Sequence, residues 1–333
     1  MATAPEQSQG SEYGDSLRTL SRRGFLAGML VLPRLAMAQS RGDTVSVINA
    51  GTNVVYLTNS SGLILLVDTG SPENAPGLFR NLPIGDSDSL IRIQPINPLT
   101  AIETREINAA GHVVIVFNTH YHADNTGSNE AFGKAGGRIL AHVNTKQWMS
   151  TPYWIPAEDR YSTPRPKAAQ PTETFYTTGS LKAGSEQIDY GYLIEAHTSG
   201  DIYVFFRNAN LLAVGDVASP ARDPELDYFT GAWIGGRVDA MDRLLKLADD
   251  ETRIVPGFGP VMTRAQLKAE RDMMSTIYDR TVDRVREADT PEEMLKAGVL
   301  DGLPRTFKDP GKFIYDLHKG LWAHHNKLNH NVV

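Results

Sequence analysis

The apolar run Val113–Phe117, inside a strand expected over His112–Asn118, is the feature that most limits the fold of this chain. An unbroken apolar run of this length is typical of a strand that is buried on both faces of a layered sheet. The polar sequence His120-Tyr121-His122-Ala123-Asp124 follows this strand directly. We therefore expect a layered fold in which a histidine loop begins where a buried strand ends.

Strands followed by a helix are predicted in each half of the chain. The first half contains a hairpin made by Val54–Thr58 and Leu63–Asp68, because both segments flank the turn composition Asn59-Ser60-Ser61-Gly62. The other expected elements are a helix at Asn129–Lys134, strands at Arg138–Ala141, Tyr192–Glu195, Ile202–Phe206, Leu211–Val214 and Arg253–Val255, a helix at Val238–Leu247, and a long loop over 150–174. This repeated pattern indicates an α/β (α+β) fold with helices outside two packed sheets.

Two capping boxes predict helices in the last part of the chain. Thr263-Arg264-Ala265-Gln266 begins a long helix that runs to about Arg286. Thr290-Pro291-Glu292-Glu293 begins another. We therefore expect a helical extension from about residue 263.

Composition excludes some partners and some metal ligands. The net charge of -6 argues against general nucleic-acid binding, and the basic residues form no polybasic run. Cysteine is absent, so disulfides and thiolate ligands are excluded. Any metal must be held by imidazole and carboxylate groups, which suit zinc, iron or manganese.

The first residues have the pattern of an export signal. Ser21-Arg22-Arg23-Gly24-Phe25-Leu26 resembles the twin-arginine signal, and the apolar run Gly24–Pro33 is far shorter than the roughly 20 residues of a membrane span. Ala36-Met37-Ala38 provides a small-x-small cleavage pattern. We predict that 1–38 is a signal peptide read by the twin-arginine export machinery, and that the domain 39–333 is periplasmic without a membrane anchor. The alternative is a disordered segment with two chance arginines.

The histidine loop has the residue types of a metal site. His120 and His122 are one residue apart at the end of a buried strand, and Asp124 lies two residues further on. Side chains spaced in this way can point to one place if the backbone leaves the strand there. A catalytic zinc ion needs three protein ligands and one open position for water. The alternative is that both histidines are ordinary polar loop residues.

The loop also resembles a known family signature. Thr119–Asn129 is similar to the His-x-His-x-Asp-His motif of the metallo-β-lactamase superfamily. Four further blocks resemble that family in the expected order: Leu66-Val67-Asp68-Thr69-Gly70, Ala196-His197-Thr198-Ser199-Gly200-Asp201, Val214-Gly215-Asp216, and Ile254-Val255-Pro256-Gly257-Phe258-Gly259-Pro260. The resemblance runs from about residue 45 to about residue 275. It implies a four-layer αββα sandwich with the metals at one sheet edge.

The resemblance also implies roles for individual residues. His120, His122 and His197 would form the first metal site, with Asp216 bridging or flanking it. Asp124 would belong to a second metal and orient the attacking water.

Two residues depart from the family pattern. Asn125 replaces the second-site histidine that follows Asp124, and Phe258 replaces the histidine of the last block. An amide oxygen is a poor zinc ligand and a phenyl ring is none. We therefore predict one tightly bound zinc per chain, with iron as the alternative, and Asp124 as a catalytic general base.

Loops over the metal would choose a small-molecule substrate. We identify 50–53, 150–174 and Ser219–Arg237 as these loops. Tyr228, Phe229 and Trp233 are predicted to form an apolar wall, and Arg237 to bind a substrate carboxylate in a bidentate manner. The alternative is that the aromatic residues only pack the loop.

Three functions remain open. The first is a metal-dependent hydrolase of a cyclic amide, lactone or other ester. The second is a mononuclear non-haem iron oxygenase that resembles the persulfide dioxygenases of the same superfamily, with His120, His197 and Asp216 as ligands. The third is a ligand-binding protein that has lost catalysis. The sequence predicts no oligomeric state.

Overall fold

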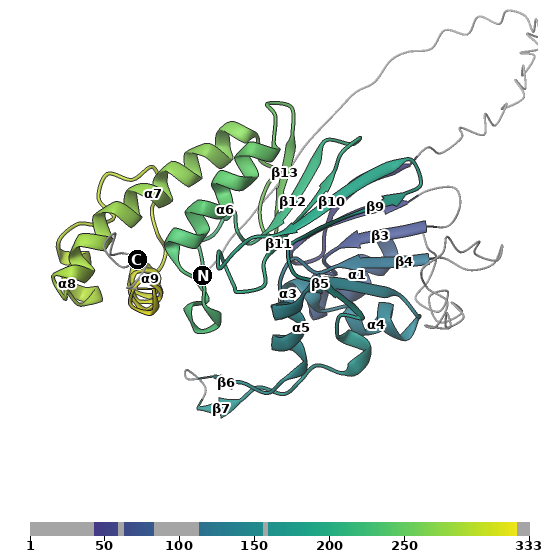
Figure 1. Ribbon diagram of the computed structural model, residues 1–333, viewed down its shortest axis with the longest axis horizontal. Helices are drawn as coiled ribbons and strands as arrows, with labels where there is room; N and C mark the ends of the chain where they lie inside the picture. Colours follow the sequence, from purple (N-terminus) through teal and green to yellow (C-terminus); the bar gives the residue numbers. More distant parts are fainter. Residues whose placement is uncertain (1–42, 59–62, 83–112, 156–158, 325–333) are drawn as a thin grey trace, which may run out of the picture. The chain divides into compact units, whose positions relative to one another are not determined.

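The computed structural model of the protein describes residues 43–58, 63–82, 113–155 and 159–324 (Figure 1). By its contacts the chain divides into residues 1–39 and residues 40–333, and all described elements belong to the second unit. The export signal predicted at 1–38 lies outside the described residues. None of the helices in the described ranges is both long enough and apolar enough to cross a membrane.

Two sheets form the framework of the described chain. The first sheet contains β1 (Thr44–Asn49), β2 (Asn53–Thr58), β3 (Leu63–Val67), β4 (Val113–Phe117), β5 (Arg138–His142) and β8 (Glu173–Phe175). The second contains β9 (Thr178–Ala183), β10 (Glu186–Tyr192), β11 (Ile202–Phe206), β12 (Leu211–Gly215) and β13 (Arg253–Pro256). Their orders are β1-β2-β3-β4-β5-β8 and β13-β12-β11-β10-β9.

Strand direction places the histidine loop at a sheet edge. β2 and β3 pair antiparallel, as the predicted hairpin requires, whereas β3, β4, β5 and β8 are parallel to one another. The carboxyl ends of parallel strands meet at one edge of the sheet. The residues after β3 and after β4 are therefore neighbours, and both segments belong to the blocks that carry the family resemblance.

Alternating side chains explain why β4 is apolar throughout. Ile115 and Phe117 face the second sheet and pack in one core with residues such as Val204 of β11. Val114 and Val116 point the other way, into a core that includes Phe132. Because successive strand residues point to opposite faces, a strand with helices on one side and a sheet on the other has no polar face.

Helices cover the outer faces of both sheets. The first sheet is covered by α1 (Ala75–Asn81) and α4 (Asn129–Lys134), and α3 (Ala123–Thr126) and α5 (Val143–Ser150) follow β4 and β5 in the chain. The second is covered by α6 (Ile234–Leu247) and α7 (Arg264–Arg286), as Figure 1 shows, and α8 (Pro291–Lys296) and α9 (Pro310–Ala323) follow. Short 3₁₀ turns lie at Pro72–Asn74 (η1), Lys167–Ala169 (η4) and Tyr228–Thr230 (η5). This is the predicted four-layer αββα sandwich.

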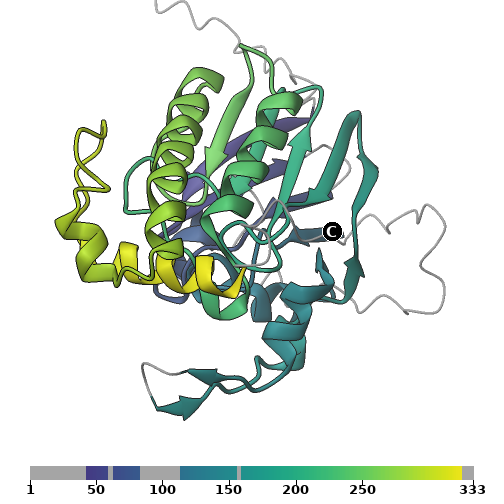
Figure 2. The ribbon, with the colours of Figure 1, turned by 60° about the vertical axis from the view of Figure 1, so that its left-hand side comes forward.

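The helical extension packs back on the loop that precedes α6. Both predicted capping boxes are present, at Thr263 for α7 and at Thr290 for α8. α9 contacts α7, α8 and η5, and Figure 2 shows it crossing near the ends of α6 and α7. The extension is therefore part of the packing around the loop before α6.

Some predicted elements need correction. The strand predicted at Tyr192–Glu195 ends at Tyr192, and Glu195 has a positive φ of 51°, which no strand residue adopts. The strand really lies at Glu186–Tyr192, where polar residues hide the apolar pattern. The loop predicted over 150–174 contains the small hairpin β6 (Trp154–Ile155) and β7 (Arg160–Tyr161).

Candidate metal centre

Three histidines from two loops come together between the sheets. His120 and His122 follow β4, and His197 lies between β10 and β11. One ring nitrogen from each lies within 4.8 Å of those of the other two. His120 and His197 are fully buried, whereas the side chain of His122 is 22% exposed. The structure therefore brings together the three residues predicted for the first metal site and leaves it accessible on the His122 side.

Two buried aspartates fix the backbones that carry these histidines. Asp68, directly after β3, accepts hydrogen bonds from the Thr119 backbone N (2.8 Å), the Thr119 hydroxyl (2.7 Å) and the Asn125 amide (3.0 Å). Asp201 accepts hydrogen bonds from the backbone N of His197 (2.6 Å) and of Thr198 (2.8 Å). Burial raises the pKa of both aspartates to about 7, against the lowering effect of these donors. Their role in the site is to set its backbone geometry.

Each histidine is oriented through its outer ring nitrogen. His120 Nδ1 lies 3.0 Å from the Thr119 hydroxyl, which gives its only hydrogen to Asp68, so the ring nitrogen is the donor. His197 Nδ1 donates to the Glu225 carbonyl at 3.0 Å. His122 Nε2 lies 3.3 Å from the Asp227 carboxylate. Outer partners of this kind select the tautomer and orient a metal-binding imidazole.

The inner nitrogens have the arrangement that a metal ion requires. His120 Nε2 is buried and has no hydrogen-bond partner among the described residues. His122 Nδ1 and His197 Nε2 lie 3.1 Å apart, although both carry a lone pair in the tautomers set by their outer partners. Ligand nitrogens around a tetrahedral zinc ion lie roughly 3.3 Å apart when the Zn–N bonds are about 2.0–2.1 Å. The three residues therefore fit a single divalent ion.

Electrostatics keep two of the three rings neutral. Burial, followed by repulsion from the neighbouring rings, lowers the pKa of His120 and of His197 well below the usual value. Burial also acts to lower the pKa of His122, but the hydrogen bond to Asp227 and the charge of that carboxylate outweigh it, and the pKa of His122 is raised. Neutral imidazole is the form that binds metal.

Asp216, which follows β12, flanks the three histidines. Its Oδ2 lies 4.0 Å from His120 Nε2 and 3.8 Å from His197 Nε2. Burial raises the pKa of Asp216 to about 6, although the neighbouring Arg222 acts in the opposite direction. A Cβ atom on Gly257, after β13, would overlap Asp216 Oδ1, so only glycine allows this close approach.

A second cluster lies beside the histidines. The carboxylates of Asp124 and Asp216 both contact the guanidinium of Arg222, through Nη1 at 3.4 Å for Asp124 and through Nη2 for Asp216. The Arg222 guanidinium also lies over the ring of Phe258, 5.3 Å from its centroid. Asn125 is fully buried and donates to Asp68. Of the two departures from the family pattern, Phe258 therefore contacts this arginine, whereas Asn125 is bonded to Asp68.

Three of the residues predicted to bind substrate require correction. Arg237 is fully buried, donates to the Glu225 carbonyl (3.0 Å) and the Ser219 hydroxyl (2.8 Å), and so has no surface for a substrate carboxylate. Trp233 is also buried and stacks on His324 with ring centroids 4.8 Å apart. Tyr228 is half-buried, and its ring contacts Tyr315 of α9. The first two predictions are wrong, because both side chains pack the loop onto the extension, and Tyr228 packs there as well.

Of the aromatic residues predicted to form the wall, Phe229 belongs to a group that adjoins the histidines. Tyr121 lies 4.5 Å from His122 between ring centroids and also contacts Trp148 and Tyr153. Phe229, which is 40% exposed, contacts Trp148 and Tyr153 at 6.1 and 6.3 Å. We call Trp148, Tyr153 and Phe229 the aromatic wall. They come from α5, the following loop and η5, so two of the loops that the sequence singled out do contribute.

Sequence reasoning missed the residues that support the site from the loop before α6. Arg222 contacts both carboxylates, and Asp227 accepts hydrogen bonds from the Tyr121 hydroxyl (2.6 Å) as well as contacting His122. One signal was present: the charged stretch Arg222-Asp223-Pro224-Glu225-Leu226-Asp227 follows the Gly215-Asp216 block, between two buried elements. His142, by contrast, caps α5 and stacks on Tyr192, away from the other histidines.

Comparison with known proteins identifies the family of the chain. Residues 48–259 match the family model of the metallo-beta-lactamase superfamily, and the chain belongs to this superfamily. Metallo-beta-lactamase IND-1 from Chryseobacterium indologenes is 25% identical over 145 residues, which are 44% of this chain and 55% of that protein. The chain thus spans about half the length of this curated relative.

Solved structures of metallo-beta-lactamases also resemble the chain. The enzyme from Pontibacter korlensis is 18% identical, with a TM-score of 0.47 over 70% of this chain and 99% of that one. DIM-1 metallo-beta-lactamase is 15% identical, with a TM-score of 0.48 over 70% of this chain and 97% of that one.

Proposed function

We propose that the protein is a hydrolase that uses one tightly bound divalent ion, with zinc favoured, to cleave a cyclic amide, a lactone or another ester of a small molecule. The observation that carries this proposal is the convergence of three imidazole nitrogens whose outer ring nitrogens are each held by a neighbour. When bound, zinc acts as a Lewis acid and lowers the pKa of water.

The chain's own residues have separate roles in this proposal. His120, His122 and His197 hold the ion, and Asp216 flanks it. Asp124, with a side chain that is 39% exposed, accepts a proton from the attacking water as general base. The aromatic wall provides apolar surface beside His122 and binds the apolar part of the substrate.

One observation favours a second candidate, the non-haem iron oxygenase. Asp216 lies at similar distances from His120 and His197, and two histidines with one carboxylate are the usual ligands of such an iron. In the structure, however, this carboxylate is paired with Arg222. His122 completes a three-histidine set instead, which favours zinc.

Elemental analysis combined with an activity panel tests the proposal. We expect one zinc per chain and turnover of a chromogenic lactam, lactone or thioester. Bound zinc and turnover should both be lost in a His122→Ala variant and after chelation. One iron per chain with oxygen uptake would support the oxygenase instead. Absence of any bound metal, or full activity of the His122→Ala variant, would contradict both enzymatic functions and support ligand binding alone.

We also propose that residues 1–38 direct export through the twin-arginine machinery and that the mature protein is periplasmic. The twin arginines Arg22 and Arg23 and the small residues Ala36 and Ala38 support this proposal. Cell fractionation of a double Arg22→Lys, Arg23→Lys variant should show the full-length chain retained in the cytoplasm, with Arg18→Lys as a matched control. A mature amino terminus near Gln39 is expected, and normal export of the double variant would exclude this route.

A further inference from the structure

The cluster beside the three histidines has an internal positive charge. Arg222 Nη2 pairs with Asp216, which is 3% exposed, and Nη1 lies 3.4 Å from Asp124. The arginine side chain itself is 30% exposed. Two carboxylates that face one position repel each other unless a cation lies between them. Here the cation is a side chain of the same protein.

The residues around this position do not fit a second metal ion. Asn125 is fully buried, and its amide donates to Asp68 at 3.0 Å. Phe258 has no metal-binding atom, and its ring faces the guanidinium at 5.3 Å. The carboxylates of Asp124 and Asp216 are already paired with Arg222. A second divalent ion would therefore have to displace a guanidinium that both carboxylates hold.

We propose that Arg222 takes the place of a second metal ion and restricts the centre to one divalent ion. Its planar guanidinium offers several N–H donors and stays charged at every accessible pH, so it can neutralise two carboxylates at once. Arg222 is thereby a positioning residue, because it holds the proposed general base, Asp124, next to the histidines. This inference rests on the proposed function only in that the histidine position binds a metal.

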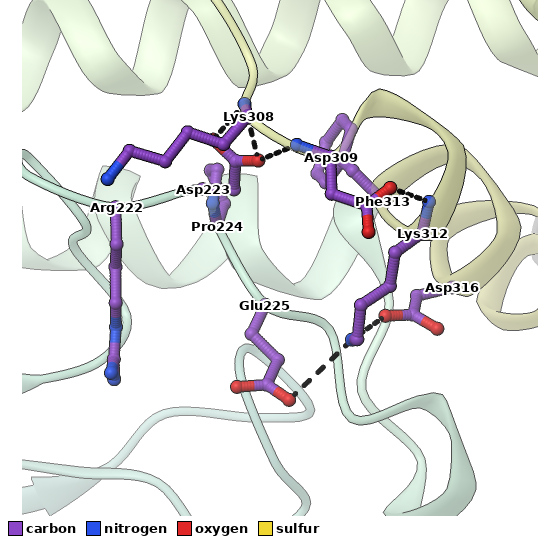
Figure 3. Close-up of a pocket in the computed structure, with 9 residues that line it drawn as sticks. All are labelled: Arg222, Asp223, Pro224, Glu225, Lys308, Asp309, Lys312, Phe313 and Asp316. Carbon is purple, nitrogen blue, oxygen red and sulfur yellow. Dashed lines mark hydrogen bonds and ion pairs between the residues drawn. The ribbon is translucent and has the colours of Figure 1, made fainter. Parts of the chain in front are cut away.

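The helical extension fixes the backbone of this arginine. Arg305 Nη1 donates to the Arg222 carbonyl at 3.3 Å. The next residue, Asp223, accepts hydrogen bonds from the backbone N of Lys308 and of Asp309, both at 2.8 Å. Figure 3 shows the contacts of Asp223 with Lys308 and Asp309, with the Arg222 side chain extending away from them. The guanidinium therefore projects toward the carboxylates from a segment whose backbone is fixed by the helical extension.

Two variants distinguish the effect of Arg222 on the number of bound ions from the effect of the two missing histidine ligands. The double variant Asn125→His, Phe258→His restores both family ligands and keeps Arg222, and the triple variant adds Arg222→Ala. Zinc per chain is measured by elemental analysis after equilibration at one fixed free zinc concentration, with cobalt absorption spectra as a second readout. We expect one ion per chain in the wild type and in the double variant, and two in the triple variant. Arg207→Ala in the double background is the matched control, because it removes a surface arginine, and should leave one ion.

The inference would be overturned if the wild type bound two ions, or if the double variant bound two ions with Arg222 intact. If the wild type binds no metal, the proposed function is contradicted. The number of ions bound by the triple variant, compared with the double variant, still tests the role of Arg222, because a difference of one ion is expected between them. If thermal melting shows that the triple variant is unfolded, Arg222→Gln and Arg222→Lys replace it. The glutamine variant should then bind a second ion weakly and the lysine variant should not, and equal binding by the two would also overturn the inference.

Discussion

The histidine position (His120, His122 and His197) and the carboxylate position (Asp124 and Asp216 with Arg222) are neighbours that balance charge in opposite ways. At the first, three ring nitrogens converge, and His120 Nε2 has no hydrogen-bond partner among the described residues. At the second, acidic groups already have a guanidinium partner. This difference shows that metal binding depends on more than the ligands present. It also depends on whether those ligands are already paired with a cation of the protein.

Loss of one histidine should have the largest effect on metal binding. Four protein ligands bind zinc with about 10–16 kcal/mol, so one ligand accounts for roughly a quarter of that, and His197→Ala should weaken zinc binding about 100- to 1,000-fold. A competition titration with a chromophoric chelator measures this affinity. His318→Gln, on α9, is the control. Asp124→Asn, at the carboxylate position, should leave the affinity nearly unchanged, and an equal loss in both variants would contradict the distinction between the positions.

Arg237→Leu should weaken both positions at once by destabilising the protein. Arg237 holds the Glu225 carbonyl that orients His197, and its buried partner Glu270 lies 3.8 Å away. Removing one partner of a buried ion pair costs about 3 kcal/mol of unfolding free energy, because the other charge stays buried. Urea denaturation measures the change. Arg207→Ala, which breaks a surface pair, should cost less than about 1 kcal/mol, and a similar cost for both variants would refute this role of Arg237.

Asp227→Asn should affect the histidine position alone. The carboxylate accepts from the outer nitrogen of His122, and loss of such an outer partner typically weakens metal binding about 10- to 100-fold. The same chelator competition measures the effect, with the surface variant Asp189→Asn as control. Unchanged zinc affinity in Asp227→Asn would show that the orientation of His122 does not depend on this contact.

Phe229→Ala should have the smallest effect and should change substrate binding without changing metal content. Its ring belongs to the aromatic wall and is partly exposed. Losing about 1 kcal/mol of apolar contact should raise KM about 5-fold for substrates with an apolar group, with kcat unchanged. Tyr176→Ala, an exposed aromatic elsewhere, is the control. A fall in kcat with constant KM would place Phe229 in the chemistry instead.

Much of the fold followed from the sequence because its buried strands are apolar on both faces. β4, β11 and β12 were predicted for that reason, within one or two residues of their observed ends. β9 and β10 were missed because their polar residues, such as Lys182 and Asp189, leave only a weak alternation. Strands with a partly exposed face depend on their partners for definition, and single-sequence patterns show these partners poorly.

The residues of the site also fall into those that the sequence predicted and those that it missed. The histidines were found because they adjoin predicted strands, whereas Arg222 and Asp227 lie in an irregular loop and act on residues far away in the sequence. The error at Arg237 arose because the helix was predicted to begin at Val238, whereas α6 begins at Ile234. In the observed helix, Arg237 lies on the same face as Ile234 and Met241, both buried, so its charge is buried as well.

Because the positive charge between the two carboxylates belongs to Arg222, it stays in place when the free zinc concentration falls. A zinc ion dissociates when its free concentration falls below its dissociation constant, so occupancy of the histidine position varies with the surroundings. The guanidinium of Arg222 is covalently attached, and its local concentration is set by the backbone contacts to Arg305, Lys308 and Asp309. Asp124 and Asp216 should therefore keep their geometry in the zinc-free protein, and one ion alone would restore the complete centre.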